Sequence, residues 1–101
     1  MKTIIASKKL MDLAVSGLRR QTVRVWRRKH SIKPGEIVTL FNYREKLPIR
    51  VVSIYEKKID ELNMDEALLN GYINLEEFKK AILTIYNQAT QLTVIRFEVL
   101  T

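Results

Sequence analysis

The order of helical and strand-like patterns along the chain is the feature that most restricts its fold. Apolar residues recur at helical spacing over residues 7–15, where Ser7 can act as the N-cap and Gly17 ends the pattern. Strand-like alternation then occurs over residues 21–26, 37–41 and 49–55, and a last strand-like run covers residues 92–100. Pro34 and Gly35 form a turn before the second of these runs, and residues 42–48 are predicted to be a loop.

Two further helices are predicted between the third and fourth strands. Asn63 with Glu66, and Asn74 with Glu77, both fit a capping residue followed three positions later by an acid that reaches back. The second helix has an apolar face, which we interpret as core packing and which consists of Leu75, Phe78, Ile82 and Ile85. The order of helix, strands, two helices and strand predicts an α+β arrangement around a small mixed or closed sheet.

Length and composition exclude several classes of protein. The 101 residues are 47% hydrophobic, which suits a single domain spanning residues 1–101. Without cysteine there is no disulfide or thiolate nucleophile, and His30 as the single histidine cannot build a metal cluster. We therefore expect no metal and no cofactor. No apolar run is long enough for a membrane span or a signal-peptide core, so the default expectation is a soluble, cytoplasmic monomer that does not contact membranes.

The positive charge is concentrated in the first third of the chain. Residues 1–34 contain ten Lys or Arg and one acidic residue, a net charge of +9, whereas residues 35–101 contain eight cations and ten anions, a net charge of −2. A one-sided field of this kind is typical of proteins that bind polyanions. The alternative is that the charges serve solubility or reflect growth temperature.

The segment 17–30 has the composition of a nucleotide-binding site. It contains six cations, the only Trp of the chain and no acidic residue. Strand alternation places Thr22, Arg24 and Trp26 on one face, and the other face is expected to be core. The turn at Gly17 would bring Arg19 and Arg20 beside the polar face. Arginine, hydroxyl and indole groups together can bind phosphate, hydrogen-bond a base and stack on it.

Three other residues extend this candidate site. Arg27 and Arg28 continue past the strand, where they could follow a nucleic-acid backbone. Tyr43 lies between two predicted strands and offers a second stacking surface near the mouth of the cleft. Structural alternatives stay open for each part of the site. Trp26 can be packing in the core or at its rim, Arg24 can form an ion pair with Glu36 or Glu98, and the basic loop can simply be solvated.

Four segments in succession resemble the ASCH domain of the PUA-like superfamily. The first resembles a Gly-x-Lys-x-x-(Glu or Thr)-x-Arg run and consists of Gly17, Arg19, Thr22 and Arg24. The other three are residues 33–38, residues 71–72 ahead of 75–78, and residues 94–98. The resemblance covers nearly the whole chain. It implies a PUA-like fold, a small curved or closed β-barrel with helices covering its ends, and a cleft that receives RNA or a modified nucleobase.

Some small members of the ASCH family are amidohydrolases that remove the acetyl group from N(4)-acetylcytidine. Their site uses the Lys of the run, a Thr three residues later and a Glu just ahead of the second late helix. By resemblance these positions are Arg19, Thr22 and either Asn70 or Gly71. Arginine stays protonated and Asn70 does not titrate, so neither serves readily in acid–base catalysis. Asp65 or Glu66 could replace the carboxylate only by reaching the cleft from the preceding helix.

The sequence therefore predicts a non-enzymatic module that binds RNA or a modified nucleotide in a basic cleft. Its candidate binding residues are Arg19, Arg20, Thr22, Arg24, Trp26, Arg27, Arg28, Tyr43 and Asn70. One alternative is an enzyme of the same fold, either an amidohydrolase acting on N(4)-acetylcytidine or a ribonuclease. A further alternative is a module whose basic face binds an acidic protein.

Overall fold

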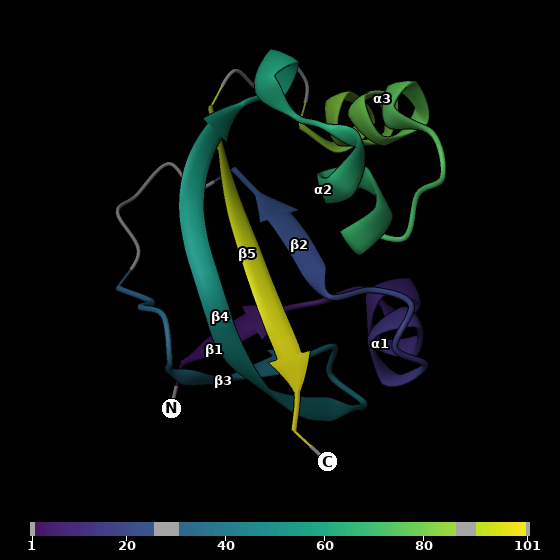
Figure 1. Cartoon of the computed structure of the whole chain (residues 1–101). Helices are drawn as coiled ribbons and strands as arrows, with labels where there is room; N and C mark the ends of the chain where they lie inside the picture. Colours follow the sequence, from purple (N-terminus) through teal and green to yellow (C-terminus); the bar gives the residue numbers. More distant parts are fainter. Residues whose placement is uncertain (1, 26–30, 87–90, 101) are drawn as a thin grey trace.

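The fold is a five-stranded sheet with three α-helices (Figure 1), in a computed structural model that describes residues 2–25, 31–86 and 91–100. The strands are β1 (Thr3–Ile5), β2 (Gln21–Arg24), β3 (Ile37–Phe41), β4 (Lys46–Lys58) and β5 (Gln91–Val99). The helices are α1 (Lys8–Val15), α2 (Met64–Leu69) and α3 (Leu75–Ile85), with a short 3-10 helix, η1 (Ile59–Glu61), before α2. All four predicted strand segments therefore contribute to one sheet, as the sequence analysis expected.

The sheet is mixed, with the strand order β1-β3-β4-β5-β2. β1 is parallel to β3, and the other three pairs are antiparallel. β4 joins the two halves of the sheet, because its first residues pair with β3 and the rest pair with β5. The register with β5 shifts between Val51 and Ser53, an irregularity that increases local bending. β4 and β5 accordingly run side by side as long curved strands, while β1 and β3 lie across their lower end (Figure 1).

The expectation of a closed barrel is wrong. In the described residues β1 and β2 form the two ends of the strand order, and no ladder joins them. These two strands are short, with three and four residues. The chain runs from β1 through α1 to β2, so a helix rather than a pair of strands covers the open side of the sheet.

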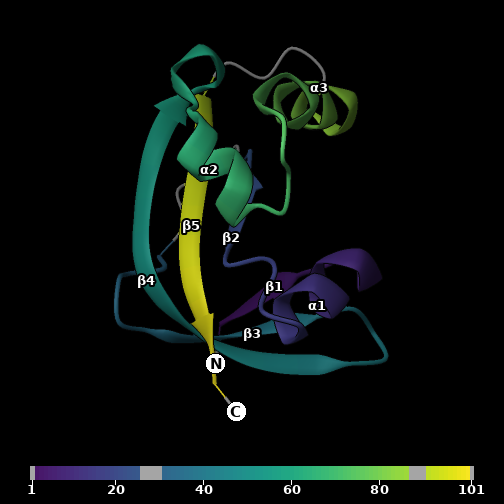
Figure 2. The same cartoon turned by 45° about the vertical axis from the view of Figure 1, so that its right-hand side comes forward.

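The core has two parts, one for each half of the sheet. In the first, Leu10, Met11 and Ala14 of α1 pack against residues of β1, β3, β4 and β5. In the second, Phe78 and Ile82 of α3 pack with α2 and the adjoining parts of β2 and β5. Figure 2 shows this division, with α2 and α3 together at one end of the sheet and α1 at the other.

The predicted helix caps are present. Ser7 accepts from Leu10 N at 3.1 Å at the start of α1, and Asn63 and Glu66 form a reciprocal capping box at α2. In α3, Asn74 accepts from Glu77 N at 3.1 Å, and only this half of the predicted pattern is formed. Each cap satisfies backbone donors that would otherwise be unpaired at the helix start.

The predicted loop 42–48 is shorter than expected, because β4 already begins at Lys46 and includes Pro48. Proline usually interrupts an interior strand since it has no N–H to donate. Here Val51 N donates to Glu36 O, and the alternation of the ladder then directs the Pro48 nitrogen away from β3. Pro48 still accepts from Leu100 N at 3.0 Å, so at most one bond near the end of the sheet is lost.

Candidate functional site

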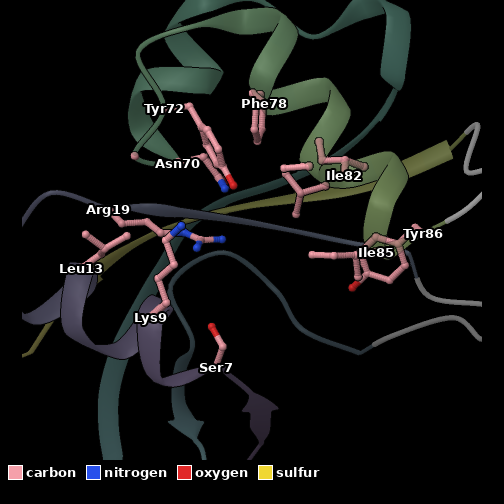
Figure 3. A pocket seen from close by; sticks show the side chains of 13 residues that line it. Ser7, Lys9, Leu13, Arg19, Asn70, Tyr72, Phe78, Ile82, Ile85 and Tyr86 are labelled. Carbon is pink, nitrogen blue, oxygen red and sulfur yellow. The ribbon is translucent and has the colours of Figure 1, made fainter.

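A pocket of about 250 Å³ lies between α1, β2 and α3 (Figure 3). We call it the Arg19 pocket. Its polar lining comes from Ser7, Lys9, Arg19, Asn70, Tyr72 and Tyr86. Its apolar lining comes from Leu13, Val23, Gly71, Phe78, Ala81, Ile82 and Ile85. The pocket therefore combines two cations, an amide and two phenols with a wall of hydrocarbon.

Arg19 is positioned by the turn that ends α1. Gly17 has φ +80°, a left-handed conformation that glycine adopts without strain, and its N–H donates to Ala14 O at 3.1 Å. Two residues later, Arg19 Nε donates to Gln21 O at 3.0 Å. This bond fixes the guanidinium at the start of β2, where it points into the pocket (Figure 3).

Burial lowers the pKa of Arg19 to about 10, with a further lowering by the charge of Arg24 that Tyr72 partly offsets. Arg19 thus remains charged at neutral pH. It can bind a phosphate or a carbonyl oxygen, but it cannot exchange a proton in that range.

Asn70 contacts Arg19 from the end of α2. Its amide can face in two ways, and we assign the orientation in which the oxygen accepts from Arg19 Nη2 and the nitrogen donates to Gln21 O, both at 3.0 Å. The opposite orientation offers a bond of 3.3 Å from Gln21 Nε2 but places two oxygens against each other. Arg19 and Asn70, predicted as neighbours in the site, therefore lie side by side.

Gln21 connects Arg19 and Asn70 to the rest of the fold. Its side chain is fully buried, and Nε2 donates to Glu66 O at 2.9 Å. Arg96 Nε in β5 donates to the Gln21 side-chain oxygen at 3.4 Å. One glutamine thus links β2, α2 and β5, which restricts how Arg19 and Asn70 can move.

The aromatic wall comes from the segment after α2 and from α3. The Tyr72 and Phe78 rings are 5.4 Å apart and tilted by 35°. Lys9 Nζ lies 5.9 Å from the centre of the Tyr72 ring, within cation–π range. Ile85, which the sequence analysis assigned to the core, is 73% exposed and lines the pocket instead.

Thr22 and Arg24 do not line the pocket, although the sequence analysis placed both in the cleft. Thr22 is only 1% exposed, because both faces of β2 are covered along residues 21–23, so the expected open polar face is absent there. Arg24 forms no ion pair with Glu36, which binds Lys2 at 2.8 Å, or with Glu98, which lies 3.9 Å from Arg50. Within the described residues Arg24 Nε is buried without a hydrogen-bond partner.

The other predicted binding residues lie elsewhere. Arg20 is exposed and lines a separate groove beside β5. Tyr43 is 77% exposed in the turn between β3 and β4, with its ring 5.0 Å from that of Phe41, and it lines a different depression near the start of α1. Trp26, Arg27 and Arg28 lie outside the described residues. Their binding roles, like those of the pocket residues, stay predictions.

Neither candidate replacement carboxylate lines the Arg19 pocket. Glu66 is buried, and its carboxylate accepts from Tyr55 Oη at 2.6 Å, Lys57 Nζ at 2.8 Å and Asn63 N at 2.9 Å. Burial by itself raises the pKa of Glu66, but these hydrogen bonds, led by that of Lys57, hold it below its usual value. Glu66 is therefore an ionised structural residue. Among the described residues there is also no group of three His, Cys, Asp or Glu that could hold a metal ion.

Lys9, Tyr72 and Tyr86 are pocket residues that the sequence analysis missed. Tyr72 had a usable signal, because it follows Asn70 and Gly71 directly and belongs to a segment already compared with the ASCH domain. Lys9 and Tyr86 had none, since one is a charged residue on a helix and the other follows a helix whose apolar face resembles core.

Comparisons with solved structures define the fold. An ASCH domain from Lactobacillus crispatus JV V101 is similar with a TM-score of 0.79 at 14% identity, covering 97% of this chain and 79% of that one. The hypothetical protein PH0355 gives a TM-score of 0.81 at 21% identity over 99% of this chain and 100% of that one. An ASCH protein from Zymomonas mobilis gives 0.69 at 10% identity over 96% and 68% of the two chains. No family model matches the sequence, and no curated protein matches it.

The chain therefore has an α+β fold built on an open mixed sheet. More particularly, its fold is ASCH-like, which confirms the resemblance that the four sequence segments indicated. In the described part of the chain, no helix has the length and apolar character needed to cross a bilayer.

Proposed function

We propose that this protein binds a base of single-stranded RNA, or a modified nucleoside, in the Arg19 pocket. The observation that carries the proposal is the pairing of a charged, half-buried guanidinium with an amide and an aromatic wall in one pocket. Proteins that recognise single-stranded RNA stack unpaired bases on aromatic rings and hydrogen-bond their edges. The Arg19 pocket offers each of these contacts.

The size of the pocket favours one nucleotide over a length of chain. Its volume of about 250 Å³ lies just below the roughly 300–1,000 Å³ of sites for drug-sized ligands. A single base fits this space, and its sugar and phosphate would extend past Lys9 and the basic residues of the first third of the chain. The ASCH-like fold of the neighbouring structures is consistent with this proposal.

Hydrolysis of N(4)-acetylcytidine is the weaker proposal. Amide hydrolysis requires a group that takes and gives a proton near neutral pH. Arg19 is charged there, Asn70 does not titrate, and the carboxylate of Glu66 is held by Tyr55, Lys57 and Asn63. Binding needs none of these groups to change its protonation state.

The substitution Arg19→Gln tests the proposal. Hydrogen bonds to charged groups contribute roughly 1.5–3 kcal/mol, so we expect at least about tenfold weaker binding of a fluorescent single-stranded RNA. The matched control is Arg50→Gln, which removes the same charge from an exposed pair with Glu98 that contributes little. Thermal unfolding followed by circular dichroism verifies that both variants fold.

Equal binding by the Arg19→Gln variant and the unaltered protein would contradict the proposed site. If an acidic protein binds as tightly as the RNA at the same salt concentration, the protein-interaction alternative is favoured. Release of acetate from N(4)-acetylcytidine above a buffer blank would instead favour the enzyme.

A further inference from the structure

One edge of β2 has no strand partner among the described residues. In this part of the chain β2 is the last strand in the sheet order and pairs only with β5. Figure 3 shows it crossing behind the pocket, between α1 and α3. Val23 is the residue of β2 that lines the pocket.

The direction of each backbone group of β2 follows from the antiparallel ladder. Phe97 N donates to Arg20 O at 2.9 Å, so Arg20 directs its carbonyl toward β5. In an antiparallel pair, successive residues direct their N–H and C=O alternately toward and away from the partner strand. With the register of β2 and β5, Thr22 and Arg24 therefore face β5, while Gln21 and Val23 face away from it.

The two outward-facing residues differ in whether they are already bonded. The Gln21 carbonyl accepts from Arg19 Nε and from the Asn70 amide, both at 3.0 Å. In contrast, within the described part of the chain no hydrogen bond beyond the β2–β5 ladder engages the backbone of Val23. A donor and an acceptor thus remain available at the pocket, next to the guanidinium of Arg19.

We propose that the backbone N–H and C=O of Val23 read the hydrogen-bonding edge of the bound base. This inference rests on the proposed function and specifies its ligand as a base with a neighbouring donor and acceptor. In an extended residue the N–H and C=O point the same way, side by side. Uracil offers O4 next to N3–H, and adenine offers N1 next to N6–H, so either base can make both bonds at once.

The same edge suits a base better than an added peptide strand. A peptide that extends a sheet bonds to several outward-facing residues in succession. β2 has only two, and Arg19 and Asn70 already occupy the carbonyl of the first. At Val23 one donor and one acceptor remain, on the strand residue that lines the pocket with Tyr72 and Phe78.

Modified RNA hexamers test this inference with the intact protein. Hexamers of uridine, 3-methyluridine and 5-methyluridine carry the same number of phosphates, but only 3-methylation removes the N3–H donor. We expect the 3-methyl hexamer to bind roughly tenfold more weakly than uridine, the effect of leaving buried hydrogen-bonding groups unpaired. The 5-methyl hexamer is the matched control for added bulk and should bind as uridine does. Adenosine and N6,N6-dimethyladenosine hexamers form the equivalent pair for adenine.

Amide NMR spectra locate the contact on the protein. The Val23 N–H signal should move when the uridine or adenosine hexamer binds, and it should not move with the blocked hexamer of the same base. The Thr22 and Arg24 amides, which face β5, should respond much less.

Three outcomes would overturn the inference. The first is that parent and blocked hexamers bind equally, in a way that depends on Arg19, and that the Val23 N–H signal does not move. This result would refute the base-edge contact and leave the proposed function standing. Binding of none of these hexamers would refute this inference, and it would also remove uridine and adenosine in single-stranded RNA from the proposed function. A Val23 signal that responds to an extended peptide, and to no RNA, would assign the edge to strand addition.

Discussion

At the scale of single residues, the two buried polar side chains Gln21 and Glu66 support Arg19 and Asn70 in the Arg19 pocket. Gln21 Nε2 donates to the backbone oxygen of Glu66, and the Glu66 carboxylate is satisfied by Tyr55, Lys57 and Asn63. Buried polar groups with all their partners make a unique arrangement stable, and the loss of one partner is costly. The position of Asn70 beside Arg19 depends on this network, since Asn70 ends the helix that Glu66 caps.

The ionisation of Glu66 predicts a pH dependence of stability. Its pKa is lower in the folded state than the value of about 4.3 for an unfolded chain, so the folded state binds fewer protons. This contribution is present above the unfolded pKa and is lost as pH falls through the folded pKa. The Glu66→Gln variant should be about 1–3 kcal/mol less stable at pH 7. Its loss of stability below about pH 5 should also be smaller than that of the unaltered protein.

Urea unfolding at a series of pH values measures both effects. Glu36→Gln is a useful comparison, because the hydrogen bond from Lys2 also lowers the pKa of Glu36, but on a more exposed side chain. A Glu66→Gln variant with unchanged stability at pH 7 would show that the carboxylate is not held as described.

At the scale of elements, β2 is a short edge strand whose two sides have different tasks. Thr22 and Arg24 direct their backbone groups to β5, and Gln21 and Val23 direct theirs away from it, with Val23 lining the pocket. The helices α1 and α3 on either side leave room for a small ligand. One edge of β2 thus pairs with β5, and we propose that the other edge contacts the ligand.

Proline substitutions distinguish the two sides of β2. Thr22→Pro removes an N–H that donates to β5, whereas Val23→Pro removes one that faces the pocket. We expect Thr22→Pro to be at least about 1 kcal/mol more destabilising than Val23→Pro, the contribution of one hydrogen bond. Chemical denaturation measures this difference, with Thr22→Ala and Val23→Ala correcting for the lost side chains. Equal losses for the two prolines would contradict the assigned directions of the backbone groups.

At the scale of the whole molecule, both cations of the Arg19 pocket belong to the strongly basic first third of the chain. Residues 1–34 carry +9, and they include Lys9 and Arg19 of the pocket. The later residues, with −2, include Glu66, which caps α2, and the acids in the first turn of α3. We propose that this separation leaves a positive field around the pocket, which would steer an anionic chain toward it.

Binding of single-stranded RNA should therefore weaken with salt. If three to four phosphates are neutralised, log K should fall against log salt with a slope of roughly −2 to −3, at about 0.7 per phosphate. Arg27→Ala should reduce the slope by somewhat less than one unit and weaken all sequences alike. Trp26→Ala should instead cost about 1–3 kcal/mol at every salt concentration, through lost stacking. Fluorescence titration at several salt concentrations separates the two, and salt-insensitive binding would refute the charge argument.

The sequence by itself determined the order of the elements, the helix caps and the concentration of charge. These properties are local: Ser7, Asn63 and Asn74 cap helices through neighbours three positions away, and Gly17 ends α1 in its own turn. The turn at Gly17 and the resemblance to the ASCH domain also predicted Arg19 for the candidate site, and the resemblance alone predicted Asn70.

Only the tertiary structure decided where the pocket lies relative to β2 and whether the sheet closes. Strand alternation distinguishes the two faces of β2, but it says nothing of the free edge, which exists only because β2 ends the strand order. Thr22 is buried because both faces of β2 are covered. Lys9, Tyr72 and Tyr86 come from separate parts of the chain and line one pocket. Such meetings depend on how helices pack across the open side of the sheet, and packing between distant segments leaves no periodic signal in the sequence.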